Sequence, residues 1–245
     1  MVEAVSAHEV FSFTLFGQKI IVTDTIVVMW VIMAVIILLV WLGTKNFKKI
    51  PKGPQNLVEM FVDFINKLCR DTIGHHGMHF APYLGTILLF LAVSNTISIF
   101  DIIPSSDQLF KLTHLEFFKN IPAVSLRPPT RDVNVTAAMA IMSIILVLGA
   151  GIRFKKMGGW LKSFVEPMPI ILPFKIMDYF IRPLSLCFRL FGNILGAFII
   201  MEFLYSAIPI LFPAALSMYF DIFDGILQAY IFVFLTTLYI TEAIE

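Results

Sequence analysis

Charged residues are scarce in this chain: Asp, Glu, Lys and Arg make up 14% of its 245 residues, whereas soluble domains average about 25%. Hydrophobic residues make up 58%, including 25 Phe. A soluble core of this length does not need such an excess, so much of the apolar surface is expected to face lipid. The net charge of only +1 gives no overall attraction to nucleic acid.

The patterns of several other protein classes are also missing. The two cysteines, Cys69 and Cys187, lie far apart in different kinds of segment and predict neither a disulfide framework nor a zinc site. The N-terminus has no basic region followed by an apolar stretch and a cleavage site, so we expect no signal peptide. No phosphate-binding Gly-rich loop ending in Gly-Lys-Ser/Thr occurs, and we expect no nucleotide chemistry and no cofactor. The run His75, His76 and His79 lacks a further His or Cys nearby, so no metal site is predicted.

Five stretches are long and apolar enough to cross about 30 Å of hydrocarbon. They cover residues 25–44, 82–103, 135–152, 170–212 and 214–240. The fourth is too long for one perpendicular helix and contains Pro183, so we expect it to begin as a tilted or interfacial piece. Pro209 and Pro213 indicate a tight turn, which would make the last two spans a long antiparallel hairpin.

A sixth helix is expected between the first two spans. Residues 54–70 place apolar side chains near helical spacing among polar ones, which is typical of an amphipathic helix on the membrane surface. The predicted fold class is therefore an all-α integral membrane protein with one membrane domain over residues 1–245. It would consist of an outer N-terminal tail (1–23), the first three spans with the surface helix (24–152) and the hairpin (167–242).

Positive charge is unequally divided between the two sides. The loops after the first and third spans hold more Lys and Arg than the N-terminal tail and the loop after the second span. Cytoplasmic loops carry this excess. We therefore expect an outer N-terminus and a cytoplasmic C-terminus.

The most informative residue is Arg189, which lies within an apolar stretch. A guanidinium at membrane depth costs a few kcal/mol to insert and is normally retained for function. It stays protonated, so it can hold a fixed charge but cannot pass a proton on. Its helix also places Ser185, Gly192, Asn193 and Gly196 on the same face at helical spacing. Gly192 and Gly196 form a G-x-x-x-G pattern that lets another helix approach closely. The alternative is that Arg189 extends to the membrane interface, because it lies only six residues past Pro183.

Acidic and polar residues recur at the expected outer ends of the helices. Asp221, Asp224 and Gln228 share one face of the last span. Asp101 ends the second span, and Asp132 opens the third. Carboxylates near a span usually line water or face a partner charge, although Asp221 and Asp224 could also cap the start of their helix. We expect Gln228 to make a polar contact with the Arg189 helix.

Several of these runs resemble subunit a of the F-type ATP synthases. The most specific is Arg182-Pro-Leu-Ser-Leu-Cys-Phe-Arg189-Leu-Phe-Gly-Asn193. Supporting runs begin at Pro82, Asp101, Asp132 and Gln228 and follow the order of the family. The resemblance covers the chain from the second span to the end.

This resemblance implies a stator subunit beside a rotating ring of proteolipids, the c subunits, each with one membrane carboxylate. Ions, either protons or sodium ions, would enter by one half-channel and leave by another, with Arg189 as the essential residue between them. Ser185, Asn193, Asp101, Asp132, Asp221, Asp224 and Gln228 would line the ion path, and Gly192 and Gly196 would contact the rotor. Peripheral stalk subunit b and the lipid bilayer would be further partners, and the chain would have no catalytic site of its own. It would lie as a multi-pass protein in the plasma membrane of a bacterium, or alternatively in the energy-transducing membrane of an organelle.

Two departures from the family pattern are visible. Some members carry a Glu nine residues after the arginine and a His seven residues before the glutamine, where this chain has Phe198 and Asp221. The resemblance implies that Asp221 and Asp224 substitute for that pair. A different class, a secondary transporter with an Arg-paired anion site, would require repeated halves, and no repeat is visible.

Overall fold

A computed structural model describes residues 9–15, 18–45, 48–97, 128–165, 169–207 and 216–244. Four described helices are long and apolar enough to cross a membrane, or five if one bent pair is a single span. The predicted α-helical membrane fold is confirmed. Asp101 and the expected turn from Pro209 to Pro213 lie outside the described residues.

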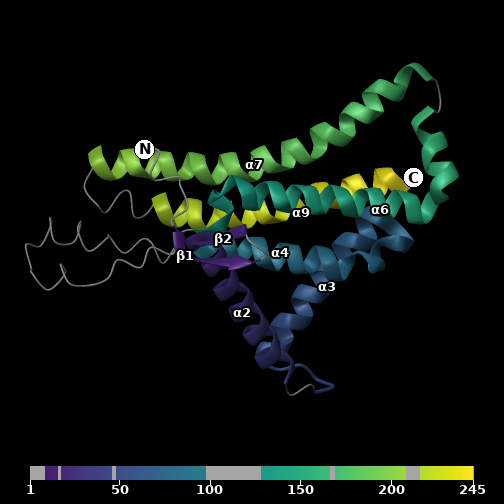
Figure 1. Ribbon diagram of the computed structural model, residues 1–245. Helices are drawn as coiled ribbons and strands as arrows, with labels where there is room; N and C mark the ends of the chain where they lie inside the picture. Colours follow the sequence, from purple (N-terminus) through teal and green to yellow (C-terminus); the bar gives the residue numbers. More distant parts are fainter. Residues whose placement is uncertain are drawn as a thin grey trace, which may run out of the picture.

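The first two helices form a V that projects from the bundle (Figure 1). Helix α2 (Asp24–Thr44) is apolar throughout, and among its residues only Ile32 and Gly43 are buried. Helix α3 (Pro54–Ile73) starts with a proline in its first turn, where the missing N–H costs nothing. It buries Ile65 and Cys69 and exposes most of its charged residues, including Asp63, Lys67 and Arg70, so the predicted amphipathic helix is confirmed.

A sharp bend joins α3 to the next span. The 3₁₀ turn η1 (Gly74–His79) leads into α4 (Ala81–Thr96), and the two helices differ in direction by 118°. Gly77 makes the bend possible because its backbone packs on Cys69. A Cβ at Gly77 would lie 2.6 Å from the carbonyl carbon of Cys69.

The remaining helices run side by side (Figure 1). They are α6 (Val133–Val165), α7 (Leu172–Ala207) and α9 (Gly225–Ile244), with the π-helical turn η6 (Tyr219–Asp224) leading into α9. Helix α9 is central and packs against α3, α4 and α6, with Phe232 and Val233 almost fully buried. The core lies between α4, α6 and α9.

The expected hairpin of the last two spans is antiparallel, as Figure 1 shows. Its packing differs from a simple hairpin, because α7 lies mainly against α6 and touches α9 much less. Helix α7 continues through Pro183 for 36 residues, about 54 Å at 1.5 Å per residue. Only part of such a helix fits within the hydrocarbon, in agreement with the expected tilted or interfacial start.

The N-terminal region contains a hairpin that we did not predict. Strands β1 (Glu9–Leu15) and β2 (Gln18–Thr23) pair antiparallel, with Phe13 opposite Ile20. The alternation of Ser12 and Thr14 with Phe11 and Phe13 is the sequence signal for a strand. Two short paired strands are thus the only non-helical regular structure in the described part of the chain.

Candidate ion-translocation site

Arg189 lies on a face of α7 that the described part of the chain leaves uncovered. Arg189, Ser185 and Gly192 are exposed, and Asn193 and Gly196 are half-buried. A Cβ built on Gly192 or Gly196 meets no atom within 4 Å. The five residues that we expected on one face therefore share a surface open to a partner, and we call it the Arg189 face.

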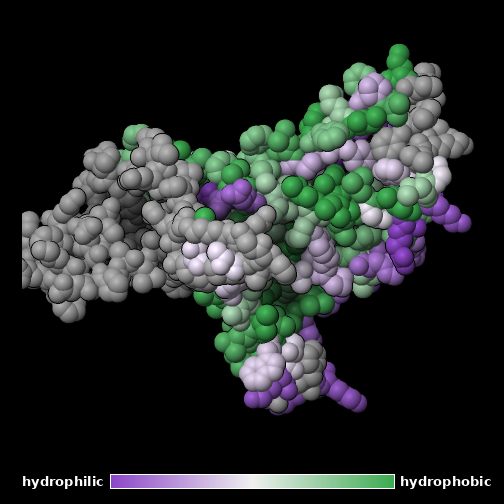
Figure 2. Space-filling view, in the orientation of Figure 1, coloured by the Kyte–Doolittle hydropathy of each residue, from purple (hydrophilic) through white to green (hydrophobic). Residues whose placement is uncertain are grey.

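Buried leucines on α7 set this orientation. Leu186 is 2% exposed and Leu190 is fully buried, and both belong to the core that contains α6 residues. Packing these side chains fixes the rotation of α7 about its axis, which leaves Arg189 outside the packed face. Its neighbours Leu184 and Phe188 are exposed apolar residues, and Figure 2 shows hydrophobic side chains covering much of the long helices. Arg189 is thus a fixed charge within an apolar, outward-facing surface.

A buried polar network lies where α4 ends and α6 and α9 begin. The Thr130 hydroxyl donates to Asn95 Oδ1 at 2.8 Å, and Asn95 Nδ2 donates to the Gly225 carbonyl at 3.0 Å. Gly225 permits this approach, since a Cβ there would lie 3.0 Å from the Cβ of Asn95. Thr130 belongs to the short turn η4 (Pro129–Arg131), so the network joins three separate parts of the chain.

The acidic residues expected at this end occupy different environments. Asp132 Oδ1 accepts from the backbone N–H of Asn134 at 2.9 Å and so caps the start of α6. Asp221 accepts from the Ser217 hydroxyl at 2.7 Å. Asp221 and Asp224 both lie in the π-helical turn η6 and are half-buried. Such π-helical turns are frequent at functional sites.

Gln228 does not make the polar contact to α7 that we expected. It is 4% exposed, and its Nε2 has no hydrogen-bond partner among the described residues. The buried hydroxyl of Ser94 in α4 also lacks a partner there. The packing of the helices is consistent with this, because α9 packs much more closely against α4 than against α7. Buried polar atoms of this kind are normally satisfied by water or an ion.

A second arginine is buried near the C-terminal end of α7. The Arg131 guanidinium carbon lies 3.4 Å from the centre of the Phe198 ring, and Arg131 is only 8% exposed. Phe198, which departs from the family pattern, thus forms a cation–π contact between η4 and α7. The sequence contains both residues but no signal that pairs them.

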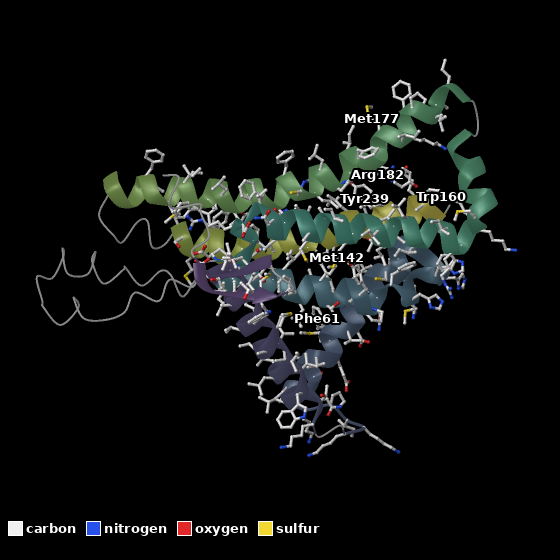
Figure 3. All side chains as sticks on the ribbon, viewed as in Figure 1. Phe61, Met142, Trp160, Met177, Arg182 and Tyr239 are labelled. Atoms are coloured by element: carbon white, nitrogen blue, oxygen red, sulfur yellow. The ribbon has the colours of Figure 1, made fainter. Side chains whose placement is uncertain are left out.

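At the opposite end, an ion pair joins α7 to α9. Arg182 Nη2 lies 2.5 Å from Glu242 Oε1, and the Arg182 guanidinium lies 5.1 Å from the centre of the Tyr239 ring. Figure 3 shows Arg182 and Tyr239 next to each other between the two helices. Arg182 lies seven residues before Arg189 in α7, which is close to two helical turns, so the two arginines start from nearly the same side of the helix. Arg182 is largely buried and paired, whereas Arg189 faces outward.

These features define a membrane-embedded helical protein with an outward-facing arginine in the middle of its long apolar helix α7 and polar groups at the helix ends. Comparison with known proteins agrees. The family model described as ATP synthase A chain matches residues 26–241, and the chain belongs to this family. The sodium-ion-specific ATP synthase subunit a of Propionigenium modestum is 32% identical over 225 residues, which cover 91% of this chain and 74% of that protein. The chain is therefore an ion-transporting membrane subunit of an ATP synthase.

Proposed function

We propose that the chain is the stator of the membrane motor, with Arg189 between two half-channels and opposite the carboxylates of a rotor ring. One observation carries this proposal. The only arginine in the middle of α7 lies on an apolar surface that no described part of the chain covers, beside two glycines open to a close neighbour. A fixed cation in that position needs an anionic partner from another chain.

The chemistry follows from the permanent charge of the guanidinium. In a low-dielectric interface, Arg189 stabilises the ionised form of a ring carboxylate and so favours release of its ion. The same charge repels any cation that moves directly from one half-channel to the other. Arg189 therefore couples ion passage to rotation without itself carrying an ion.

The outer half-channel would follow the polar side chains at the α4, α6 and α9 ends. Asp221 and Asp224 would lie at its mouth, and the buried Gln228 and Ser94 would extend it inward through water. Asp132 and Asp101 would border the same mouth, and Ser185 and Asn193 would lie beside Arg189. These roles rest on position and on polar atoms that lack protein partners.

Partners and orientation complete the proposal. The Arg189 face would meet the proteolipid ring of c subunits, and peripheral stalk subunit b would hold the chain in place. The N-terminus would lie outside and the C-terminus in the cytoplasm of a bacterium. Each ion crossing the membrane supplies about 2.3 kcal/mol per 100 mV, so several ions must be pooled by a multi-site rotor to make one ATP.

Substitution of Arg189 tests the proposal. In the assembled complex, Arg189→Ala should lower ion-driven ATP synthesis by about 100-fold or more, the scale of losing one electrostatic contact in a catalytic site. Lys49→Ala, which removes an exposed cation elsewhere, is the matched control and should retain synthesis. Assembly is checked by recovery of all subunits. Coupled synthesis that persists in an assembled Arg189→Ala complex would contradict the assignment.

The same preparation identifies the ion. The Propionigenium modestum relative is sodium-specific by name. ATP-driven pumping by reconstituted vesicles, measured with and without sodium at constant pH, separates sodium from proton transport.

A further inference from the structure

The C-terminal part of α6 carries cations at a defined depth. The apolar stretch from Val133 to Ile152 contains 20 residues, about 30 Å of helix and therefore about one hydrocarbon thickness. Arg153, Lys155 and Lys156 follow at once. These side chains are thus placed where the acyl chains end and the lipid phosphates begin.

The histidines of η1 lie against the same end of α6. The His76 ring is 4.4 Å from the Phe154 ring, centre to centre, and the His79 ring is 6.5 Å from it. Phe154 belongs to the turn of α6 that also carries Arg153 and Lys155, so the contact places η1 beside this turn. Figure 3 shows nitrogen-bearing side chains gathered where α3 turns into α4, and Figure 2 shows hydrophilic residues at this end of the bundle.

These cations have no carboxylate partner in the described part of the chain. Among the described residues, an ion pair at this end joins Arg182 to Glu242, and Arg153, Lys155 and Lys156 take part in none. Clustered cations at the edge of the hydrocarbon repel one another unless an anion lies between them. The geometry therefore leaves a place for a ligand with negative charge.

Local backbone and apolar neighbours narrow the chemistry of that ligand. Lys156 has φ of 58° and ψ of 157°, a conformation that a non-glycine residue holds only at a cost, and such strain often accompanies a binding site. It interrupts α6 and turns the chain at the cation cluster. Two methionines near the cations are exposed: Met157 of α6 is 58% exposed, and Met78 of η1 is 45% exposed. A ligand here would meet cations with its polar part and methionines with an apolar part.

We propose that Arg153, Lys155 and Lys156, with His75, His76 and His79, bind the headgroup of an anionic phospholipid such as phosphatidylglycerol. The guanidinium and ammonium groups would contact the phosphate, and the imidazole N–H groups would donate further hydrogen bonds. Met78 and Met157 would contact the acyl chains. This headgroup site stands apart from the Arg189 face and does not depend on the proposed role of Arg189.

The test uses the intact complex in nanodiscs of phosphatidylcholine and phosphatidylglycerol. Native mass spectrometry counts phosphatidylglycerol molecules retained on the complex as the lipid ratio is varied. The triple variant Arg153→Gln, Lys155→Gln and Lys156→Gln should weaken retention at one site by about tenfold or more, because each cation near a charged lipid surface contributes measurably to binding. The control triple variant Lys48→Gln, Lys49→Gln and Lys52→Gln removes the same charge from the loop between α2 and α3 and should leave that site intact.

Two further measurements separate loss of lipid binding from loss of assembly. Single substitutions of Lys155 or Lys156 should give partial losses even if the triple variant assembles poorly. Soluble short-chain phosphatidylglycerol should compete for the site, whereas inorganic phosphate should not. Equal competition by inorganic phosphate, equal loss in the control variant, or unchanged retention in every α6 variant would overturn the proposal.

Discussion

At the scale of single residues, the two arginines on and beside α7 show how environment separates their roles. Arg131 is buried and stacked on Phe198, so its charge is used inside the fold. Arg189 carries the same permanent charge but is exposed on an uncovered face. The side chains are chemically identical, and only their neighbours decide which one is left accessible.

Cys69 gives a prediction at the same scale. Burial raises the pKa of its thiol from 9.0 to about 11, because the core disfavours the thiolate. Only the thiolate reacts, so at pH 8 the reactive fraction falls about 100-fold below that of an ordinary thiol. In a Cys187→Ser background, alkylation of folded protein should be very slow at pH 8 and rise about tenfold per pH unit up to about pH 11. Mass spectrometry of samples taken at fixed times measures the alkylated fraction. In unfolded protein, Cys69 should react at the rate of an exposed thiol. Fast alkylation of the folded protein at pH 8 would show that the thiol is not buried.

At the scale of elements, the bend between α3 and α4 depends on one glycine. In Gly77→Ala the new methyl would meet the Cys69 carbonyl, at 2.6 Å from its carbon. Backbone cannot move aside cheaply there, so we expect a loss of about 1–3 kcal/mol in stability. Thermal unfolding in detergent measures the loss. Gly149→Ala is the matched control, because its Cβ meets nothing within 4 Å, and equal melting temperatures for the two variants would argue against this packing.

The Arg182–Glu242 ion pair is the second element-scale feature, because it joins α7 to α9 at the end away from the Thr130–Asn95–Gly225 network. Glu242 is 63% exposed, so water screens the pair and we expect a coupling energy of only about 0.2–1 kcal/mol. A double-mutant cycle with Arg182→Gln and Glu242→Gln, read by thermal unfolding, measures it. Additive effects of the two substitutions would mean that the side chains do not interact.

At the scale of the whole molecule, the uneven distribution of Lys and Arg predicts its orientation. Ser12 in β1 and Lys49 in the loop after α2 are both exposed. In a background without the native cysteines, Ser12→Cys should react with a membrane-impermeant maleimide added outside intact cells. Lys49→Cys should react only after the membrane is opened. The opposite pattern would reverse the topology.

The sequence by itself determined the class of this protein. Long apolar stretches, Arg189 inside one of them and the amphipathic pattern of α3 follow from local composition and spacing, which act the same way in any fold. The strands of the N-terminal hairpin show an alternation of polar and apolar residues, but we predicted only an N-terminal tail there.

Only the tertiary structure decided which polar residues meet. It buried Gln228 without a hydrogen-bond partner for its Nε2 among the described residues, paired Arg131 with Phe198 and Arg182 with Glu242, and joined Thr130, Asn95 and Gly225. Helical periodicity gives the face of one helix, but the rotation and neighbours of each helix depend on how buried side chains such as Leu186 and Leu190 pack together. That packing joins residues far apart in the chain, and no local pattern encodes it.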